Sequence, residues 1–381
     1  MAWRIPFNRP APVGREGEYF AEALASDHYS GDGPWTERCQ ELLRKELGAA
    51  KVLLTTSCTH ALEMTALLLD LEPGDEVIVP SFSFVTSVNA FVLHGARPVF
   101  VDVRPDTLNL DETLLEAAVT PRTRAIVVVH YGGVACEMDP ILDLARRHGL
   151  AVIEDNAHGL FGRYRGRPLG TLGSLATLSF HETKNFTCGE GGALVINEPS
   201  LTERSEILRE KGTDRSRFFR GEVDKYTWVD VGSSYLPSDL LAAVLFAQLE
   251  ERERIRTRRE EIWRTYRDRL AGWAAGRGAS LPTVPEHCDQ THHLFYLLLP
   301  SLAERTELID HLKGRGILSV FHYLPLHLSA MGRRYGGRPG DCPVTEDVSD
   351  RLLRLPFYNS MTEAEQAEVV EAILDFGRAG G

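Results

Sequence analysis

The sequence lacks the features that define several large classes of protein. Its 381 residues carry a formal net charge of −12, which argues against a general nucleic-acid binder because phosphate contacts need a basic face. No apolar run reaches the length that crosses a bilayer, and residues 1–10, with Arg4 and Arg9 among prolines, lack the apolar core of a signal peptide. We therefore expect a globular protein that binds neither nucleic acid nor membrane.

Cysteine pairs and clustered histidines are also absent. The six cysteines are scattered without a C-x-x-C pair, so we expect neither a disulfide scaffold nor structural zinc, and a reducing cytoplasm fits as the location. Among the thirteen histidines, His322 and His327 flank Tyr-Leu-Pro-Leu, which cannot be one helical turn. The pattern predicts no metal site.

What the sequence does contain is an alternation of short apolar runs with helix-length segments. The expected strands are 52–55, 76–79, 98–102, 125–130, 151–155, 176–180 and 193–197. The segments expected to be helical between them include 59–69, 86–94, 111–118 and 138–147. Short runs rich in Val and Ile that alternate with helices indicate an α/β fold with a mainly parallel sheet covered on both faces.

Both ends of the chain extend this pattern. Helices are expected at 16–24 and at 36–47, the second ended by Gly48. The polar turn between them has glycines on both sides of Asp32, which would suit a loop that contacts a substrate, although it is also an ordinary turn. A long charged helix, 238–270, is expected to lead to a smaller α/β part with strands at 293–299 and 318–322. We predict two domains, 1–245 and 246–381.

One stretch, 179–192, places Lys184 between a strand and a glycine-rich turn. Ligands collect at the carboxyl ends of the strands in such sheets, so 55–59, 80–84, Asp155 and Lys184 can converge. A lysine that is desolvated there becomes nucleophilic near neutral pH, which imine formation requires. Taken alone, Lys184 is better described as a surface lysine that follows a strand.

The other strand ends match the needs of pyridoxal phosphate (PLP). Residues 56–59 start a helix, where unpaired N–H groups favour a phosphate dianion. Phe84 could lie on the cofactor ring, and Asp155, at a strand end, would gain a cationic partner in the protonated ring nitrogen. Each feature also has an ordinary explanation, as a helix cap or a core residue. Their occurrence together, in this order ahead of Lys184, favours a PLP site.

The sequence resembles the sugar aminotransferases of the DegT/DnrJ/EryC1/StrS family over nearly its whole length. The resemblance is carried by the segments 80–85, 101–105, 153–158, 179–192 and 322–327. It implies a fold-type I PLP-dependent transferase that works as a homodimer, with the active site at the subunit interface.

The resemblance also implies roles for single residues. Lys184 would form the imine with PLP, and Asp155 would pair with the pyridine nitrogen. The remaining cofactor contacts implied are the phosphate ligands Ser57, Cys58, Thr59 and Ser179, the stacking residue Phe84, and the neighbouring His158. Many family members carry Asn and Arg in the loop that crosses to the other subunit, whereas this chain has Ser234 and Leu236, so the contact that Ser234 makes across the interface is open.

A narrower resemblance concerns the substrate. Segments 211–221 and 224–228 are similar to the branch that aminates dTDP-4-keto-6-deoxyglucose. That branch implies transfer of the amino group of L-glutamate to sugar C4, with Lys184 moving the proton, to give 2-oxoglutarate and a dTDP-4-amino-4,6-dideoxyhexose of gluco or galacto configuration. The substrate contacts expected from these segments and the site are Asp32, Asn185, Phe218, Arg220, Lys225, His322, Tyr323 and His327.

Three other functions share parts of this pattern. A PLP-dependent sugar dehydratase of this family has a histidine where Lys184 stands. A non-catalytic PLP-binding regulator would bring a DNA-binding domain, for which the net charge of −12 and the span of the resemblance leave no room. A dinucleotide-dependent dehydrogenase would need G-x-G-x-x-G after the first strand, and residues 55–60, which follow that strand, do not match this motif.

Overall fold

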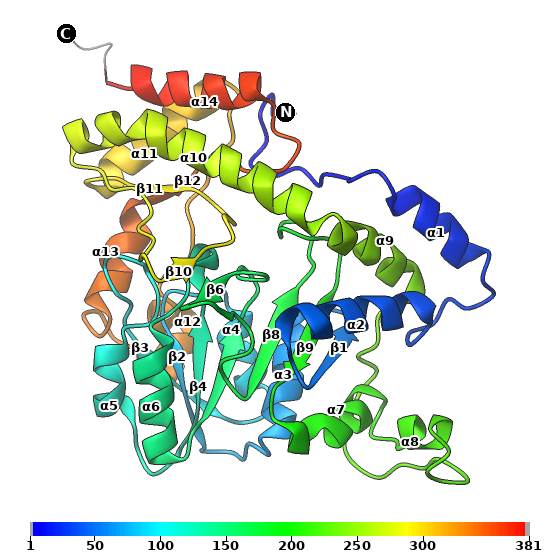
Figure 1. The fold of residues 1–381 in the computed structure, drawn as a ribbon. Helices are drawn as coiled ribbons and strands as arrows, with labels where there is room; N and C mark the ends of the chain where they lie inside the picture. Colours follow the sequence, from blue (N-terminus) through cyan, green and yellow to red (C-terminus); the bar gives the residue numbers. More distant parts are fainter. Residues whose placement is uncertain (1–2, 378–381) are drawn as a thin grey trace.

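A seven-stranded sheet forms the centre of the computed structural model, which describes residues 3–377 (Figure 1). Its strand order is β1-β9-β8-β5-β4-β2-β3. Only β9 runs against the others, because it pairs antiparallel with both β1 and β8 while the remaining pairs are parallel. The strands are β1 Lys51–Thr55, β2 Glu76–Pro80, β3 Arg97–Val101, β4 Thr123–Val129, β5 Ala151–Asp155, β8 Leu175–Ser179 and β9 Gly192–Ile196. The expected mainly parallel sheet is confirmed.

Helices cover the sheet on both faces, which explains why its strands are mainly apolar. In β4, Ile126 and Val128 pack in one core cluster with α6, whereas Ala125 and Val127 pack in another with α3 and α4. Period-two alternation therefore puts one apolar set on each face. The covering helices are α3 Cys58–Leu68, α4 Thr86–Val92, α5 Leu115–Ala118 and α6 Met138–His148.

The β1 end of the sheet is covered by α1 Glu16–Leu24, α2 Pro34–Leu47 and α9 Asp239–Glu250. Gly48 ends α2 in the left-handed conformation (φ 74°), as expected. The buried carboxylate of Asp239 accepts hydrogen bonds from the amides of Trp35 and Thr36. One acidic residue in the first turn of α9 thus also satisfies the open N–H groups at the start of α2.

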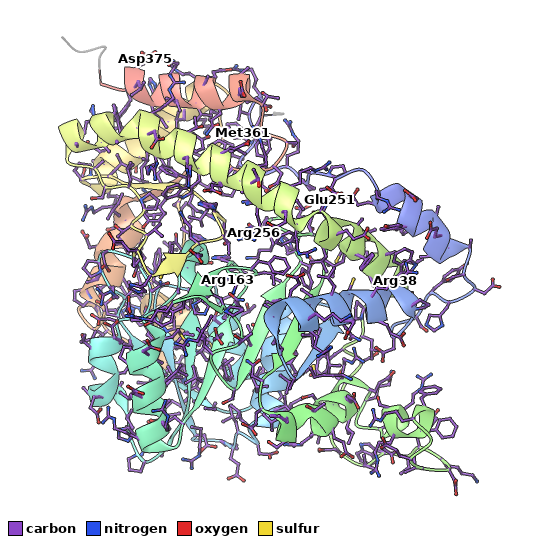
Figure 2. The ribbon with its side chains drawn as sticks, in the orientation of Figure 1. Arg38, Arg163, Glu251, Arg256, Met361 and Asp375 are labelled. Carbon is purple, nitrogen blue, oxygen red and sulfur yellow. The ribbon has the colours of Figure 1, made fainter. Side chains whose placement is uncertain are left out.

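The expected single helix over 238–270 is wrong, because α9 ends at Glu250 and α10 Arg252–Arg277 follows. Glu251, labelled in Figure 2, lies at the junction with φ −89° and ψ 17°. The two helices pack in different hydrophobic cores. Helix α9 packs with α1, α2 and the sheet, whereas α10 from Ile262 onward packs with the C-terminal elements. The break lets each helix follow its own apolar surface.

The expected strand at 318–322 is also wrong. Its backbone forms one isolated bridge, between Val320 and Arg354, and the amide of Leu318 donates instead to the carbonyl of Ile5. The neighbouring carbonyl of Phe321 accepts from the Arg354 side chain. Because its backbone groups have partners on different elements, the segment cannot continue as one ladder.

A second apolar cluster, drawn above the sheet in Figure 1, joins α10 to the end of the chain. Its elements and the smaller ones around it are β10 Cys288–Asp289, β11 Tyr296–Leu298, α11 Leu302–Gly314, α12 Ala330–Arg334, α13 Pro343–Arg351, β12 Leu352–Arg354 and α14 Glu363–Asp375. The remaining elements are β6 Arg163–Tyr164, β7 Arg167–Pro168, α7 Thr202–Arg209 and α8 Arg215–Phe219. We retain two domains as a proposal, although the boundary between residues 245 and 246 falls inside α9.

All six cysteines are free thiols. Over the described range, 3–377, no helix combines the length and the apolar character needed to cross a bilayer.

Candidate active site

A buried carboxylate ends β5. Asp155 is 5% exposed, and its oxygens accept hydrogen bonds from the Ser87 hydroxyl (2.6 Å) and the Ala157 amide (3.2 Å). Within residues 3–377 it forms no salt bridge with a lysine, arginine or histidine. A buried carboxylate without a cation is unfavourable, so Asp155 is placed to receive a positively charged group.

The turn from β1 into α3 forms a cup of backbone N–H groups. Ser57 caps the helix by accepting from the His60 amide (3.1 Å), and Cys58 and Thr59 occupy the first turn, whose N–H groups have no partner within a helix. A side chain at Gly192 would meet the cup, because a Cβ there would lie 2.3 Å from the Ser57 carbonyl carbon. Glycine at this position therefore lets β9 approach the cup closely.

The cup, the carboxylate and Ser179 belong to one site. Ser179 is the register partner of Gly192, which lies against the cup. Thr177 pairs with Asp155 across β5 and β8, and its hydroxyl lies 3.5 Å from the Cys58 sulfur. Burial, with the negative charge of Asp155, raises the pKa of the Cys58 thiol to about 12, so it stays protonated.

Lys184 lies just beyond the end of β8. Its amide donates to the His181 carbonyl (2.9 Å), which fixes the turn, while its ammonium has no hydrogen-bond or salt-bridge partner in the described part of the chain. Burial lowers the pKa of Lys184, the charges of Cys58 and Asp155 oppose this, and the Arg354 cation adds to it. The structure thus brings Lys184 near Asp155 and Cys58, with an amine that is more readily deprotonated than a free lysine.

A layer of histidines lies beside Lys184. The His158 ring stacks on His293 with centroids 4.1 Å apart and planes at 19°, and His158 Nδ1 accepts from the Gly132 amide (3.3 Å). Asn185, the residue after Lys184, lies 2.8 Å from His293 Nδ1 through its Oδ1 and donates to the Thr291 carbonyl (2.9 Å). Burial first, then the Lys184 charge and Arg354, holds the pKa of His158 well below its usual value, so this ring is neutral.

Arg259 of α10 holds the backbone of this layer. It is 4% exposed and donates to the carbonyls of His292 (3.0 Å) and His293 (2.6 Å) and to Asn359 (2.7 Å). His292 has a left-handed φ of 51°, an unfavourable conformation that such bonds can maintain. Neither His293 nor Arg259 was expected from the sequence; the adjacent pair His292-His293 ahead of an apolar run was the only available signal.

Replacing Arg259 tests whether its hydrogen bonds to the carbonyls of His292 and His293 stabilise the protein. Arg259→Leu leaves two buried carbonyls without donors, each costing roughly 1–3 kcal/mol, so we expect urea unfolding to show a loss of about 2–4 kcal/mol. Arg256→Leu is the matched control, because Arg256, one turn earlier on α10, is partly exposed (36%) and pairs with Glu253 of the same helix; it should change stability by about 0.5 kcal/mol or less. Equal stability of the two variants would contradict a stabilising role for the Arg259 hydrogen bonds.

A surface pocket of about 490 Å³ opens next to this layer, lined mainly by residues 83–85 and 321–326. His322 stacks on Tyr323 at 3.6 Å, and its Nδ1 lies 2.7 Å from the Tyr131 hydroxyl. Phe84 is 56% exposed, with its ring 6.4 Å from that of Tyr323. His322, Tyr323 and Phe84 are therefore brought together, and Phe84 presents a free aromatic surface.

Other expected substrate contacts are occupied within the chain. His327 is fully buried, with Nδ1 2.6 Å from the Ser81 hydroxyl and Nε2 3.0 Å from a Glu346 oxygen, so a substrate contact would require these bonds to break. Asp32 accepts two bonds from the buried Arg209 (2.6 and 2.7 Å). Asn185 is bound within the histidine layer.

The expected contacts Phe218, Arg220 and Lys225 lie on or after α8, at the edge of the molecule in Figure 1. Arg220 pairs with Glu206 of α7 and with Glu222, and Lys225 is exposed. Ser234 is also exposed and bridges to Glu210. Within one chain, these residues are not part of the cluster around Lys184.

PLP fits the residues that do converge. Its phosphate needs unpaired N–H groups, as at the start of α3; its protonated ring nitrogen needs an anion without a cation, as at Asp155; and its aldehyde needs an amine with a lowered pKa, as at Lys184. One bound molecule thus accounts for a buried anion and a half-buried amine that form no salt bridge within residues 3–377. The fold and this site define a PLP-dependent aminotransferase.

Comparison with known proteins gives the family. The sequence model of the DegT/DnrJ/EryC1/StrS aminotransferase family matches residues 13–374, and the chain belongs to this family. The GDP-perosamine synthase of Caulobacter vibrioides is 34% identical, over 97% of both chains.

Two solved structures are similar throughout. The aminotransferase TlmJ from Streptoalloteichus hindustanus superposes with a TM-score of 0.90 at 30% identity, covering 98% of this chain and 99% of TlmJ. Spr1654 of Streptococcus pneumoniae, solved in the PMP form, has a TM-score of 0.89 at 26% identity, covering 97% of this chain and 98% of Spr1654. PLP is the cofactor of the family, and this chain is a PLP-dependent sugar aminotransferase.

Proposed function

We propose that this aminotransferase moves the amino group of L-glutamate to C4 of dTDP-4-keto-6-deoxy-D-glucose, giving a dTDP-4-amino-4,6-dideoxyhexose and 2-oxoglutarate. Lys184 is the observation that supports amination rather than dehydration. It is a half-buried amine with a lowered pKa, and the dehydratases that resemble this family have a histidine at its position. The segments 211–221 and 224–228 support the dTDP sugar.

The residues of the site divide the work of the reaction. When bound, PLP supplies the electron sink for the carbon that loses its proton. The cup of Ser57, Cys58 and Thr59, with Ser179, holds the phosphate, and Asp155 keeps the ring nitrogen protonated. Phe84 covers the ring from its exposed position, while the neutral His158 lies beside it.

Proton transfer is assigned to Lys184. Its amine takes the proton from the α carbon of the donor and later delivers a proton to sugar C4. A single base on one side of the site serves both substrates, so the protons leave and arrive from the same side. Burial lowers the pKa of this amine, which favours the deprotonated form that acts as a base.

The homodimer is part of the proposal. The segment 215–231 exposes apolar side chains at the edge of the molecule, among them Trp228 (77%) and Phe219 (69%). Exposed aromatic groups gathered on one segment are typical of an interface. If this segment packs against a second copy of the chain, it brings Phe218, Arg220, Lys225 and Ser234 toward the active site of that copy.

The double variant Phe219→Asp/Trp228→Asp tests the dimer. Burying two carboxylates in an apolar interface is strongly unfavourable, so we expect the mass by light scattering to fall from about twice 42.5 kDa to 42.5 kDa. Leu302→Asp, at an exposed position on α11 (45%), is the control and should remain a dimer. A double variant that stays dimeric would show that 215–231 is not the interface.

The substrate is tested by offering the 4-keto-6-deoxy sugars of dTDP, UDP and GDP with L-glutamate to the holoenzyme. We expect the dTDP sugar to give the highest kcat/KM, and the proton NMR coupling at C4 of the product to report whether the new amine is axial or equatorial. Preference for the GDP sugar, which the name of the Caulobacter relative indicates for that protein, would refute the dTDP assignment but leave the aminotransferase intact.

A further inference from the structure

Ser87, in the first turn of α4, directs its hydroxyl at the buried carboxylate of Asp155 rather than at its own helix. Ser87 is fully buried, and its Oγ donates to Asp155 Oδ2 at 2.6 Å. A buried serine in a helix commonly donates to the carbonyl four residues earlier, as Ser205 of α7 does to Leu201 (2.7 Å). The bond from Ser87 instead spans 68 residues of chain and joins α4 to the end of β5.

The Asp155 carboxylate is held by one donor at each oxygen. Oδ1 accepts from the Ala157 amide (3.2 Å), which belongs to the turn after β5, and Oδ2 accepts from Ser87 of α4. Rotation of an aspartate carboxylate about its bond to Cβ is otherwise broad, so these two donors together fix the plane of the group. Each carboxylate oxygen can accept two hydrogen bonds, and each therefore keeps the capacity for one more.

In the described part of the chain, Ser87 is the only side chain that donates to this carboxylate. Thr177 pairs with Asp155 across β5 and β8, but its hydroxyl lies 3.5 Å from the Cys58 sulfur. The charge of Asp155 affects the pKa of Lys184, yet the two groups form no salt bridge within residues 3–377. Without the Ser87 hydroxyl, the carboxylate would be held only by the amide of its own turn.

Ser87 is also bonded to Phe84. Its amide donates to the Phe84 carbonyl (3.1 Å), and the Phe84 ring remains 56% exposed beside the 490 Å³ pocket. One residue thus links the aromatic side chain placed to cover the cofactor ring with the carboxylate placed to meet its nitrogen. The ring is covered on its face and paired at its edge, so the two groups must keep a fixed relation to each other.

We propose that Ser87 is a positioning residue for the cofactor: its hydroxyl holds the Asp155 carboxylate in the orientation that accepts the protonated ring nitrogen of PLP. Ser87 acts through Asp155 and takes no part in proton transfer. The inference rests on the role of Asp155 in the proposed function.

Two cofactors that differ only at the ring nitrogen test the proposal apart from turnover. PLP and deazapyridoxal phosphate, which has a C–H group in place of that nitrogen, are titrated into the full-length cofactor-free protein. The ratio of their dissociation constants measures the preference for the ring nitrogen. Ser87→Ala should reduce this preference about 5- to 10-fold, the range of one hydrogen bond. Affinity for the deaza analogue should change by less than about twofold.

Two further variants show whether Ser87 acts through Asp155. In the Asp155→Asn background, Ser87→Ala should change the preference by less than about twofold, because the two side chains act as one unit. Ser205→Ala removes the hydroxyl of a buried helical serine outside the site, and this matched control should keep the wild-type preference.

A Ser87→Ala protein that keeps the wild-type preference, or that loses affinity for both cofactors alike, would overturn the proposal. A wild type without preference for PLP would contradict the role of Asp155 and would overturn this inference with it. No sugar or amino donor enters the titration, so a wrong substrate assignment would leave its result unchanged.

Discussion

Lys184→Ala should abolish glutamate-dependent amination of the keto sugar. The substitution removes both the amine that holds the cofactor and the base that moves the proton, and a positioned base alone contributes about 10²- to 10⁴-fold. The loss of both roles predicts a fall in kcat of at least about 10⁴-fold. A coupled assay for 2-oxoglutarate measures it.

Two variants separate this chemistry from charge and folding. Lys184→Arg keeps a cation but has no amine that can be deprotonated, so it should be as inactive as Lys184→Ala. Lys45→Ala removes a lysine from a 67% exposed position and should keep full activity. Turnover retained in Lys184→Ala would refute the role assigned to this residue.

Asp155→Asn should lower kcat by about 10²- to 10³-fold, as expected when one preorganised electrostatic group is removed from an active site. The reason is that a neutral amide cannot keep the ring nitrogen protonated. The same change should not destabilise the cofactor-free protein, because it removes a buried charge without a cationic partner while the bonds to Ser87 and Ala157 can be kept by the amide. Asp155→Asn should therefore lower kcat without lowering the unfolding temperature of the cofactor-free protein.

Asp143→Asn is the matched control, since Asp143 is 68% exposed on α6. It should change neither kcat nor the unfolding temperature of the cofactor-free protein. If Asp155→Asn kept wild-type kcat, or if its cofactor-free form unfolded at a much lower temperature, Asp155 would be a structural residue rather than the partner of the cofactor.

The fold could be predicted where local signals are strong. The helix at 16–24 and the strand at 151–155 have the predicted bounds, because capping, periodicity and Val/Ile runs act within a few residues. The prediction failed at 238–270 and 318–322, where a helix passes between two cores and where backbone groups pair with Ile5 and an arginine side chain. Both failures arise from tertiary contacts that no local pattern contains.

That the inner residues lie together could be predicted, because they follow strand ends that a parallel sheet brings together; their roles stay predictions. Lys184, Asp155 and the cup at 57–59 are of this kind. His293 could not, because it meets Asn185 across 108 residues of chain. Arg259 and Arg354 are two among 42 lysines and arginines, and only the structure shows that neither has an acidic partner.

Borohydride reduction of the yellow holoenzyme, followed by peptide mass spectrometry, tests the central role of Lys184 most directly. Reduction fixes an imine as a stable amine, so we predict that the mass of the reduced cofactor appears on the peptide that contains Lys184 and on no other lysine. A label on a different lysine, or a colourless protein that takes up no PLP, would contradict it.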